Sequence, residues 1–260
     1  MKGVGLRCIG VWLLLIPSVV ALQPAFGGWP GFLPGMAGIT LGVLVGYLTA
    51  RFRLSLLLTV LATLVTYLLF GGAFALPRTT IAGFVPTLDT VRRLVLLSVQ
   101  SWRDLLTVAT PADDFTGPAV VPWLLGLLGG VVAATLAART RAVFWPLLPS
   151  LVLLIVSITM GVRTAPTATW LGAALGAGML VWVWVHQTMT QRADNADILV
   201  NNQAESSQTL RRAMAAAALL GVGVSATVMA TGITGSNTHR DVLRDHIAPP
   251  LNLRNYPSPL

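Results

Sequence analysis

The side chains that could support catalysis are few in this sequence, and their spacing keeps them apart. A thiol nucleophile needs a histidine base within hydrogen-bond reach. The single cysteine, Cys8, stands at the start of the first apolar segment, whereas His239 and His246 follow the last one. If the apolar segments cross a membrane, roughly 30 Å of hydrocarbon separates the thiol from both imidazoles. We therefore expect no Cys-His pair here, and we expect Cys8 to be a small residue that faces lipid.

Other catalytic signatures are missing from the sequence. It contains no Gly-x-x-x-x-Gly-Lys phosphate loop, no His-Glu-x-x-His zinc pair and no Gly-x-Ser-x-Gly elbow. Asp113 and Asp114 follow Pro111 in a turn, where adjacent acids are usually solvated rather than bound to a metal. His186 stands at the end of an apolar segment and is typical of an interfacial residue. We therefore expect no catalytic residue, no cofactor and no metal ligand in this chain.

The composition indicates a chain that faces lipid. Hydrophobic residues make up 55% of it and charged residues only 10%, against about 25% charged in soluble domains. The net charge of +8 results from a shortage of acids, nine against 17 lysines and arginines. Because the basic residues stand in small groups between apolar runs, we expect the lipid bilayer as partner and no nucleic acid.

Seven apolar segments are long enough to cross a bilayer as helices of roughly 20 residues. They lie near 8–26, 33–50, 54–76, 118–138, 143–161, 167–187 and 213–234, and none contains Asp, Glu, Lys or Arg. The predicted fold is all-α, a polytopic transmembrane bundle of about seven spans over residues 1–234. The first segment also resembles a signal peptide with a loose cleavage site at 19–21. We favour an uncleaved signal-anchor, because the apolar run continues past that site.

The short loops between these segments differ in charge, which predicts the orientation. Basic residues of cytoplasmic loops outnumber those of outer loops in membrane proteins. This rule assigns nine basic residues to the cytoplasm, namely Lys2, Arg7, Arg51, Arg53, Arg139, Arg141, Arg192, Arg211 and Arg212. The sequence therefore predicts a multi-pass protein of a bacterial plasma membrane, with a cytoplasmic N-terminus and an extracytoplasmic C-terminus.

Small residues recur at four-residue spacing in four of the segments, which places them on one face of each helix. The glycines of this pattern are Gly38, Gly42, Gly46, Gly126, Gly130, Gly172, Gly176 and Gly221. Such a face lets two helix backbones approach closely. It can serve dimerisation or packing within one bundle, and the presence of four such helices in one chain favours the second.

One outer segment is predicted to be an amphipathic helix over 88–107, too polar to span the membrane. Its apolar stripe comprises Leu88, Val91, Val95, Val99, Trp102 and Leu106. Thr87 is a plausible N-cap, and Asp89 in the first turn suits the helix dipole. We expect this helix to lie on the outer membrane surface or to roof the bundle.

Two polar segments are left outside the bundle. Residues 188–212 are cytoplasmic in this topology and form either a loop or helix extension, or a docking site for a cytosolic partner. Residues 235–260 are extracytoplasmic, and their last 13 residues hold Pro249, Pro250, Pro257 and Pro259. Such a composition is typical of an extended connector. We expect it to lead into a domain beyond residue 260.

Two stretches carry a family resemblance. One comprises Leu243-Arg244-Asp245, Pro249-Pro250 and Tyr256-Pro257-Ser258-Pro259-Leu260. The other comprises Trp102-Arg103-Asp104-Leu105-Leu106-Thr107, followed by Pro111 and by Pro122 at the start of the next apolar segment. In both stretches, and in the architecture of the whole chain, the sequence resembles the N-terminal membrane domain of actinobacterial TgpA-type transglutaminase-like membrane proteins.

The resemblance implies a covalently linked extracytoplasmic transglutaminase-like domain with a Cys-His-Asp site beyond residue 260. It also implies a MoxR-type ATPase and a DUF58 protein as possible partners. None of the family's catalytic residues falls on this chain. Under this hypothesis Trp102, Arg103 and Asp104 are candidate contacts to the missing domain, although Trp102 alone is more typical of a headgroup anchor. The alternatives are a transporter or channel subunit and a free-standing scaffold for cytosolic partners.

Overall fold

The computed structural model describes residues 2–107, 117–140, 142–160 and 168–195. Helices make up nearly all of this part, and its only β pairing is an isolated bridge between Ile81 and Val85. The elements in chain order are α1 (Lys2–Val20), η1 (Gln23–Phe26), α2 (Trp29–Arg51), α3 (Leu56–Ala75), η2 (Pro77–Thr79), α4 (Leu88–Thr107), α5 (Val120–Arg139), η3 (Trp145–Leu147), α6 (Leu148–Thr159) and α7 (Ala168–Asn195). The all-α fold class is confirmed for these residues.

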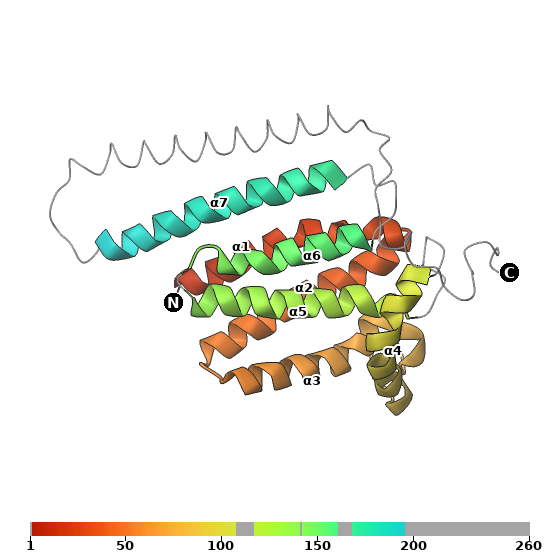
Figure 1. Ribbon diagram of the computed structural model, residues 1–260. Helices are drawn as coiled ribbons and strands as arrows, with labels where there is room; N and C mark the ends of the chain where they lie inside the picture. Colours follow the sequence, from red (N-terminus) through yellow and green to blue (C-terminus); the bar gives the residue numbers. More distant parts are fainter. Residues whose placement is uncertain (1, 108–116, 141, 161–167, 196–260) are drawn as a thin grey trace.

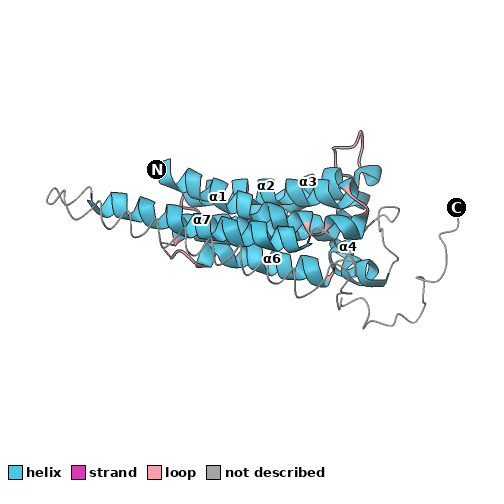
Figure 2. Ribbon diagram, turned by 90° about the horizontal axis from the view of Figure 1, so that it is seen from above, coloured by secondary structure: helices cyan, strands magenta, loops and turns pink. Residues whose placement is uncertain are grey.

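Six of the helices run side by side along one direction, and α4 lies across one end of them (Figure 1). Seen from above, α1, α2, α3, α6 and α7 again run along one direction (Figure 2). We call the end covered by α4 the α4 end. The opposite end carries the connectors 52–55 and 140–144 and the start of α1, and we call it the arginine end because Arg51, Arg53 and Arg139 lie there.

Among the described residues, three helices are long and apolar enough to cross a membrane: α2, α3 and α5. Three shorter apolar helical stretches cover residues 4–20, 145–159 and 170–186. Six of the seven predicted apolar segments are therefore helical in the described part of the chain. The seventh, 213–234, lies outside the described residues, as do Pro111, Asp113, Asp114 and the connector 235–260. These helices make the protein a membrane protein by length and composition.

The ends of some helices differ from the prediction. The first segment was expected to be one helix over 8–26, but α1 begins at Lys2 and ends at Val20. A separate turn of 3-10 helix follows, and Gly27 ends it in the left-handed conformation, at φ 69°, where glycine is favoured. By contrast, α7 continues past the end of its predicted apolar segment to Asn195. The polar segment predicted for 188–212 therefore begins as an extension of this helix.

The core of the bundle is the pair α2 and α5, which run parallel and touch backbone to backbone. A Cβ atom on Gly38 would lie 2.7 Å from the carbonyl oxygen of Trp123, and one on Gly126 would lie 2.6 Å from that of Gly35. A Cβ atom on Gly42 would likewise meet the carbonyl oxygen of Leu127.

Gly46 and Gly130 complete the row of glycines in this contact. Their Cβ positions would lie 2.7 Å from Ala134 Cβ and 2.8 Å from the Ile39 carbonyl oxygen. Five of the eight predicted packing glycines thus lie in one helix contact inside the bundle.

The other three predicted glycines are not part of this contact. At Gly172 and Gly176 of α7, no described atom lies within 4 Å of a Cβ position. The glycine of α7 that packs closely is Gly178, whose Cβ would lie 2.8 Å from Leu14 of α1. Four-residue spacing gives a face but not the side on which the neighbour lies, so packing at Gly172 and Gly176 stays a prediction. Gly221 lies outside the described residues.

Serine hydroxyls join α1 to α6 inside the bundle. Ser18 donates to the carbonyl oxygen of Ser150 at 2.9 Å, and Ser157 donates to the carbonyl oxygen of Ser18 at 2.8 Å. All three serines are buried. Because lipid offers no water to satisfy such groups, each hydroxyl needs a protein acceptor. These bonds fix α6 against α1 although α6 has only 12 residues.

Candidate functional site

The α4 end carries the residues that the sequence singled out, and α4 itself is built as predicted. The helix begins at Leu88 and ends at Thr107, the bounds expected from the sequence. The hydroxyl of Thr87 accepts the backbone N–H of Thr90 at 3.1 Å, and the hydroxyl of Thr90 accepts the backbone N–H of Thr87 at 3.2 Å. This reciprocal arrangement confirms Thr87 as the N-cap and closes the first turn from both sides.

Hydrogen bonds from neighbouring elements hold α4 in place. The hydroxyl of Tyr67 on α3 donates to the Leu94 carbonyl oxygen at 3.2 Å and shares a 2.6 Å bond with the hydroxyl of Ser98. Ser101 donates to the carbonyl oxygen of Gly117 at 3.0 Å, just before α5. The side chains of Leu94 and Leu105 are fully buried against the bundle. α4 is therefore anchored to both α3 and the start of α5.

The face of α4 that packs on the bundle is not the predicted apolar stripe. Leu88, Val95 and Val99 of that stripe are exposed, at 90%, 57% and 77%. The buried face holds Thr90, Leu94, Leu97, Ser101 and Leu105 instead. Small hydroxyl residues allow close packing there, whereas a hydropathy pattern favours the larger aliphatic side chains. The stripe therefore remains open at the surface beside the packed face.

The three candidate contact residues fall in the last two turns of α4. Trp102 is half-buried and packs against the cluster formed by Leu22, Phe26 and Leu105, and its Nε1–H donates to the Ser98 carbonyl oxygen at 3.0 Å. Trp102 thus lies toward the bundle. Asp104 is half-buried. Arg103 belongs to the helix, but its side chain lies outside the described residues. The contact of these three residues with a further domain stays a prediction.

The arginine end joins two connectors that the sequence assigned to one side of the membrane. Arg139, in the last turn of α5, donates through Nη2 to the carbonyl oxygen of Leu54 at 2.7 Å and to the hydroxyl of Thr59 at 3.4 Å. Arg51 lies in the last turn of α2, and Arg53 follows it with φ 52°. Three of the predicted cytoplasmic arginines thus lie together, at the end opposite α4.

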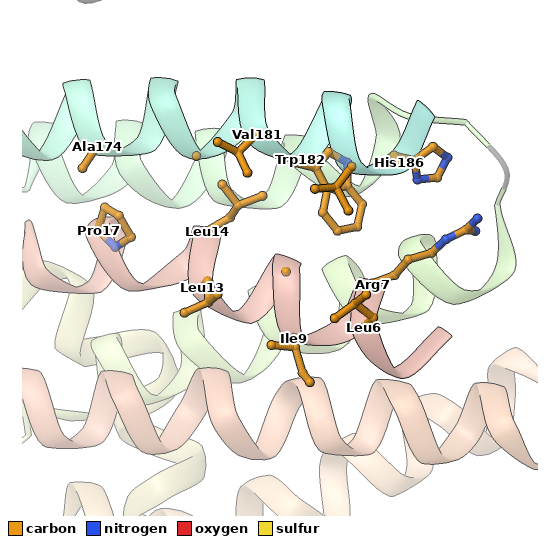
Figure 3. Close-up of a pocket in the computed structure, with 13 residues that line it drawn as sticks. Leu6, Arg7, Ile9, Leu13, Leu14, Pro17, Ala174, Val181, Trp182 and His186 are labelled. Carbon is orange, nitrogen blue, oxygen red and sulfur yellow. The ribbon is translucent and has the colours of Figure 1, made fainter. Parts of the chain in front are cut away.

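A groove between α1 and α7 is the feature that sequence reasoning missed. It has a volume of about 430 Å³ and is lined by both helices. The helices approach closely at its edge, because a Cβ on Gly10 would lie 2.8 Å from the ring of Trp182. Arg7 and His186 lie at one end of the groove, whereas Pro17 and Ala174 lie at the other (Figure 3). Gly10 and the four-residue step from Trp182 to His186 are the signals that could have indicated it.

The groups suited to nucleophilic or metal chemistry are scattered in the described part of the chain. No three His, Cys, Asp or Glu side chains gather there as a metal site would require. Cys8 was expected to face lipid, but it is buried at 4% exposure among Val11 and other core residues. The correction follows from the face of α1 that carries Cys8, which packs on the neighbouring helices with Val11 and Leu15, whereas Ile9 and Leu13 are exposed on the opposite face.

Comparison of the chain with protein-family models, with curated proteins and with solved structures found no match. The resemblance to TgpA-type proteins therefore stays a prediction that rests on the two sequence stretches quoted above.

Proposed function

We propose that this chain is a seven-span membrane domain that anchors an extracytoplasmic domain and presents it at the α4 end. The observation that carries the proposal is that the arginine end and the α4 end lie at opposite ends of the bundle. Arg51 and Arg139 end α2 and α5, and Arg53 follows in the connector that Arg139 contacts at Leu54, so all three lie at one end, which the positive-inside rule assigns to the cytoplasm. The α4 end is then the outer face of a bacterial plasma membrane. A span over 213–234 would bring the connector 235–260 to this same outer face.

The presented domain, in this proposal, is transglutaminase-like and follows residue 260. Its chemistry would be acyl transfer or amide hydrolysis by a thiolate, with a histidine as base. Support comes from the stretch 102–107, which belongs to α4, and from the proline-rich tail. The bundle would contribute no reacting group and would position the domain at a fixed height above the bilayer.

The build of α4 suits a platform. Its attachments to Tyr67 and to Gly117 hold it across the bundle end, while its outer side keeps Asp89, Arg92 and Arg93 exposed. The 2.7 Å ion pair between Asp89 and Arg93 orders that outer side, although an exposed pair of this kind adds little stability. A domain above α4 would meet a rigid, charged surface. A MoxR-type ATPase or a DUF58 protein would instead reach the arginine end, through residues 188–212.

The size of the native protein in its own membranes tests the proposal. An antibody against residues 238–260 serves as the probe on intact cells. We expect a band larger than the 27.5 kDa of this chain by a whole domain, and we expect protease added outside to remove it. A band at 27.5 kDa would overturn the platform function in favour of a scaffold. A larger band that external protease leaves intact would overturn the orientation.

No observation in the described residues favours transport over anchoring. The polar groups buried within the helices are mainly Ser and Thr hydroxyls, and several of these bond to carbonyl oxygens. Thr63, for example, donates to Thr59 at 2.8 Å, and Thr49 donates to Val45 at 2.9 Å. Transporters commonly place ionisable groups at membrane depth. Substrate-dependent flux in liposomes would revive the transporter alternative.

A further inference from the structure

The groove between α1 and α7 opens sideways from the bundle. Leu13 of α1 and Val181 of α7 form its rims and are exposed, at 55% and 49%. Leu14 and Trp182 form its floor and are buried. Gly10 and Gly178 also line the groove, and their close contacts with Trp182 and Leu14 hold the two helices together there. In a membrane, the open side of the groove would face acyl chains.

One end of the groove is cationic. The guanidinium of Arg7 lies at this end, beside His186 (Figure 3). The Nε atom of Arg7 is buried and has no hydrogen-bond partner among the described residues. A buried donor without a partner is destabilising, and more so when it is charged. The site therefore favours an incoming anion that accepts this bond.

The length of the groove matches one leaflet. From Arg7 to Pro17 it follows ten residues of α1, which is about 15 Å at 1.5 Å per residue. That is roughly half of the 30 Å hydrocarbon core. Because Arg7 lies near the arginine end of the bundle, the cationic end stands at the height of the headgroups, and the apolar floor runs toward the middle of the bilayer.

We propose that this groove binds one anionic phospholipid of the leaflet at the arginine end. Its phosphate accepts hydrogen bonds from Arg7, and one acyl chain lies along Leu13, Leu14 and Val181. Basic pockets between helices on the cytoplasmic side are suited to anionic headgroups. The segment 213–234 is the other possible occupant, but it contains no acidic residue and would leave Arg7 without an anion. The proposal is independent of the function proposed above.

Native mass spectrometry of the full chain in detergent, with phosphatidylglycerol or phosphatidylcholine added, tests the headgroup contact. We expect one phosphatidylglycerol to bind roughly tenfold more tightly than phosphatidylcholine, because both lipids carry the phosphate but the choline cation of phosphatidylcholine cancels the net charge of its headgroup beside Arg7. The Arg7→Gln variant should lose this preference. Arg51→Gln, a control at the same end but outside the groove, should keep it. Equal binding of both lipids, or a preference that survives Arg7→Gln, would overturn the proposal.

A second arm tests the position of the acyl chain and does not depend on Arg7. Phosphatidylglycerol with a photoactivatable acyl chain should crosslink to Leu13, Leu14 or Val181 in proteoliposomes. Ala174→Phe, which adds a ring at an exposed position in the groove, should lower this yield several-fold. Val60→Phe on the lipid-facing side of α3 should not. Crosslinks spread evenly over exposed residues such as Leu57 would contradict the proposal, as would a groove that stays unlabelled because 213–234 fills it.

Discussion

At the scale of single residues, the α2/α5 contact depends on glycines, which have no side chain to hold the two backbones apart. We expect Gly42→Ala to lower the thermal unfolding midpoint in detergent and to lower the free energy of unfolding by about 1–3 kcal/mol. The reason is that the new Cβ meets the backbone of Leu127 and Val131, which cannot rotate away. Gly172→Ala is the matched control, because its Cβ would meet no described atom. Equal losses in the two variants would show that the close contact is not what stabilises the bundle.

The N-cap of α4 is a second residue whose effect can be measured. Thr87→Val removes the acceptor for the Thr90 N–H and a 3.2 Å bond to the Thr79 carbonyl oxygen. We expect the free energy of unfolding to fall by about 1 kcal/mol. We also expect faster hydrogen exchange at the first amides of α4. Thr80→Val, whose hydroxyl bonds only the nearby Pro77 carbonyl, should leave these amides unchanged. Unchanged exchange in Thr87→Val would mean that the cap does not hold the first turn.

At the scale of elements, the sequence predicted the position of α4 but not the face that it buries. Its bounds follow from Thr87, from Asp89 and from the length of the amphipathic pattern. Its buried face depends on Tyr67 and Gly117, which reach Leu94, Ser98 and Ser101 from other elements. Such partners are far away in the sequence, and hydropathy alone cannot indicate them.

The open stripe of α4 leads to a test at this same scale. If α4 lies in the headgroup layer, a spin label at Val99→Cys should be relaxed more strongly by oxygen, which concentrates in lipid. A label at Gln100→Cys, on the polar side, should be relaxed more strongly by a water-soluble nickel complex. Both positions are exposed, so neither label should disturb packing. Equal access of the nickel complex to both would contradict the surface position and leave the stripe for a protein partner.

At the scale of the whole molecule, apolar segments and loop charges predicted most of the architecture. Six predicted segments are helices, and Arg51, Arg53 and Arg139 lie at one end as the loop charges required. The ends of the helices were harder to predict, because α6 stops at Thr159 and α1 stops at Val20 although the apolar runs continue. The groove was missed because it needs Arg7 and Trp182, which lie on helices separated by most of the described chain.

The orientation of the bundle is the central claim, and thiol accessibility tests it most directly. Gln100→Cys lies on the exposed side of α4, and Phe52→Cys lies at the arginine end, where Phe52 is 68% exposed. Cys8 is buried, so the unaltered protein serves as the background. A membrane-impermeant maleimide should label Gln100→Cys in intact cells and Phe52→Cys only after the membrane is opened. Labelling in the reverse order, or of both variants from outside, would contradict an α4 end that faces away from the cytoplasm.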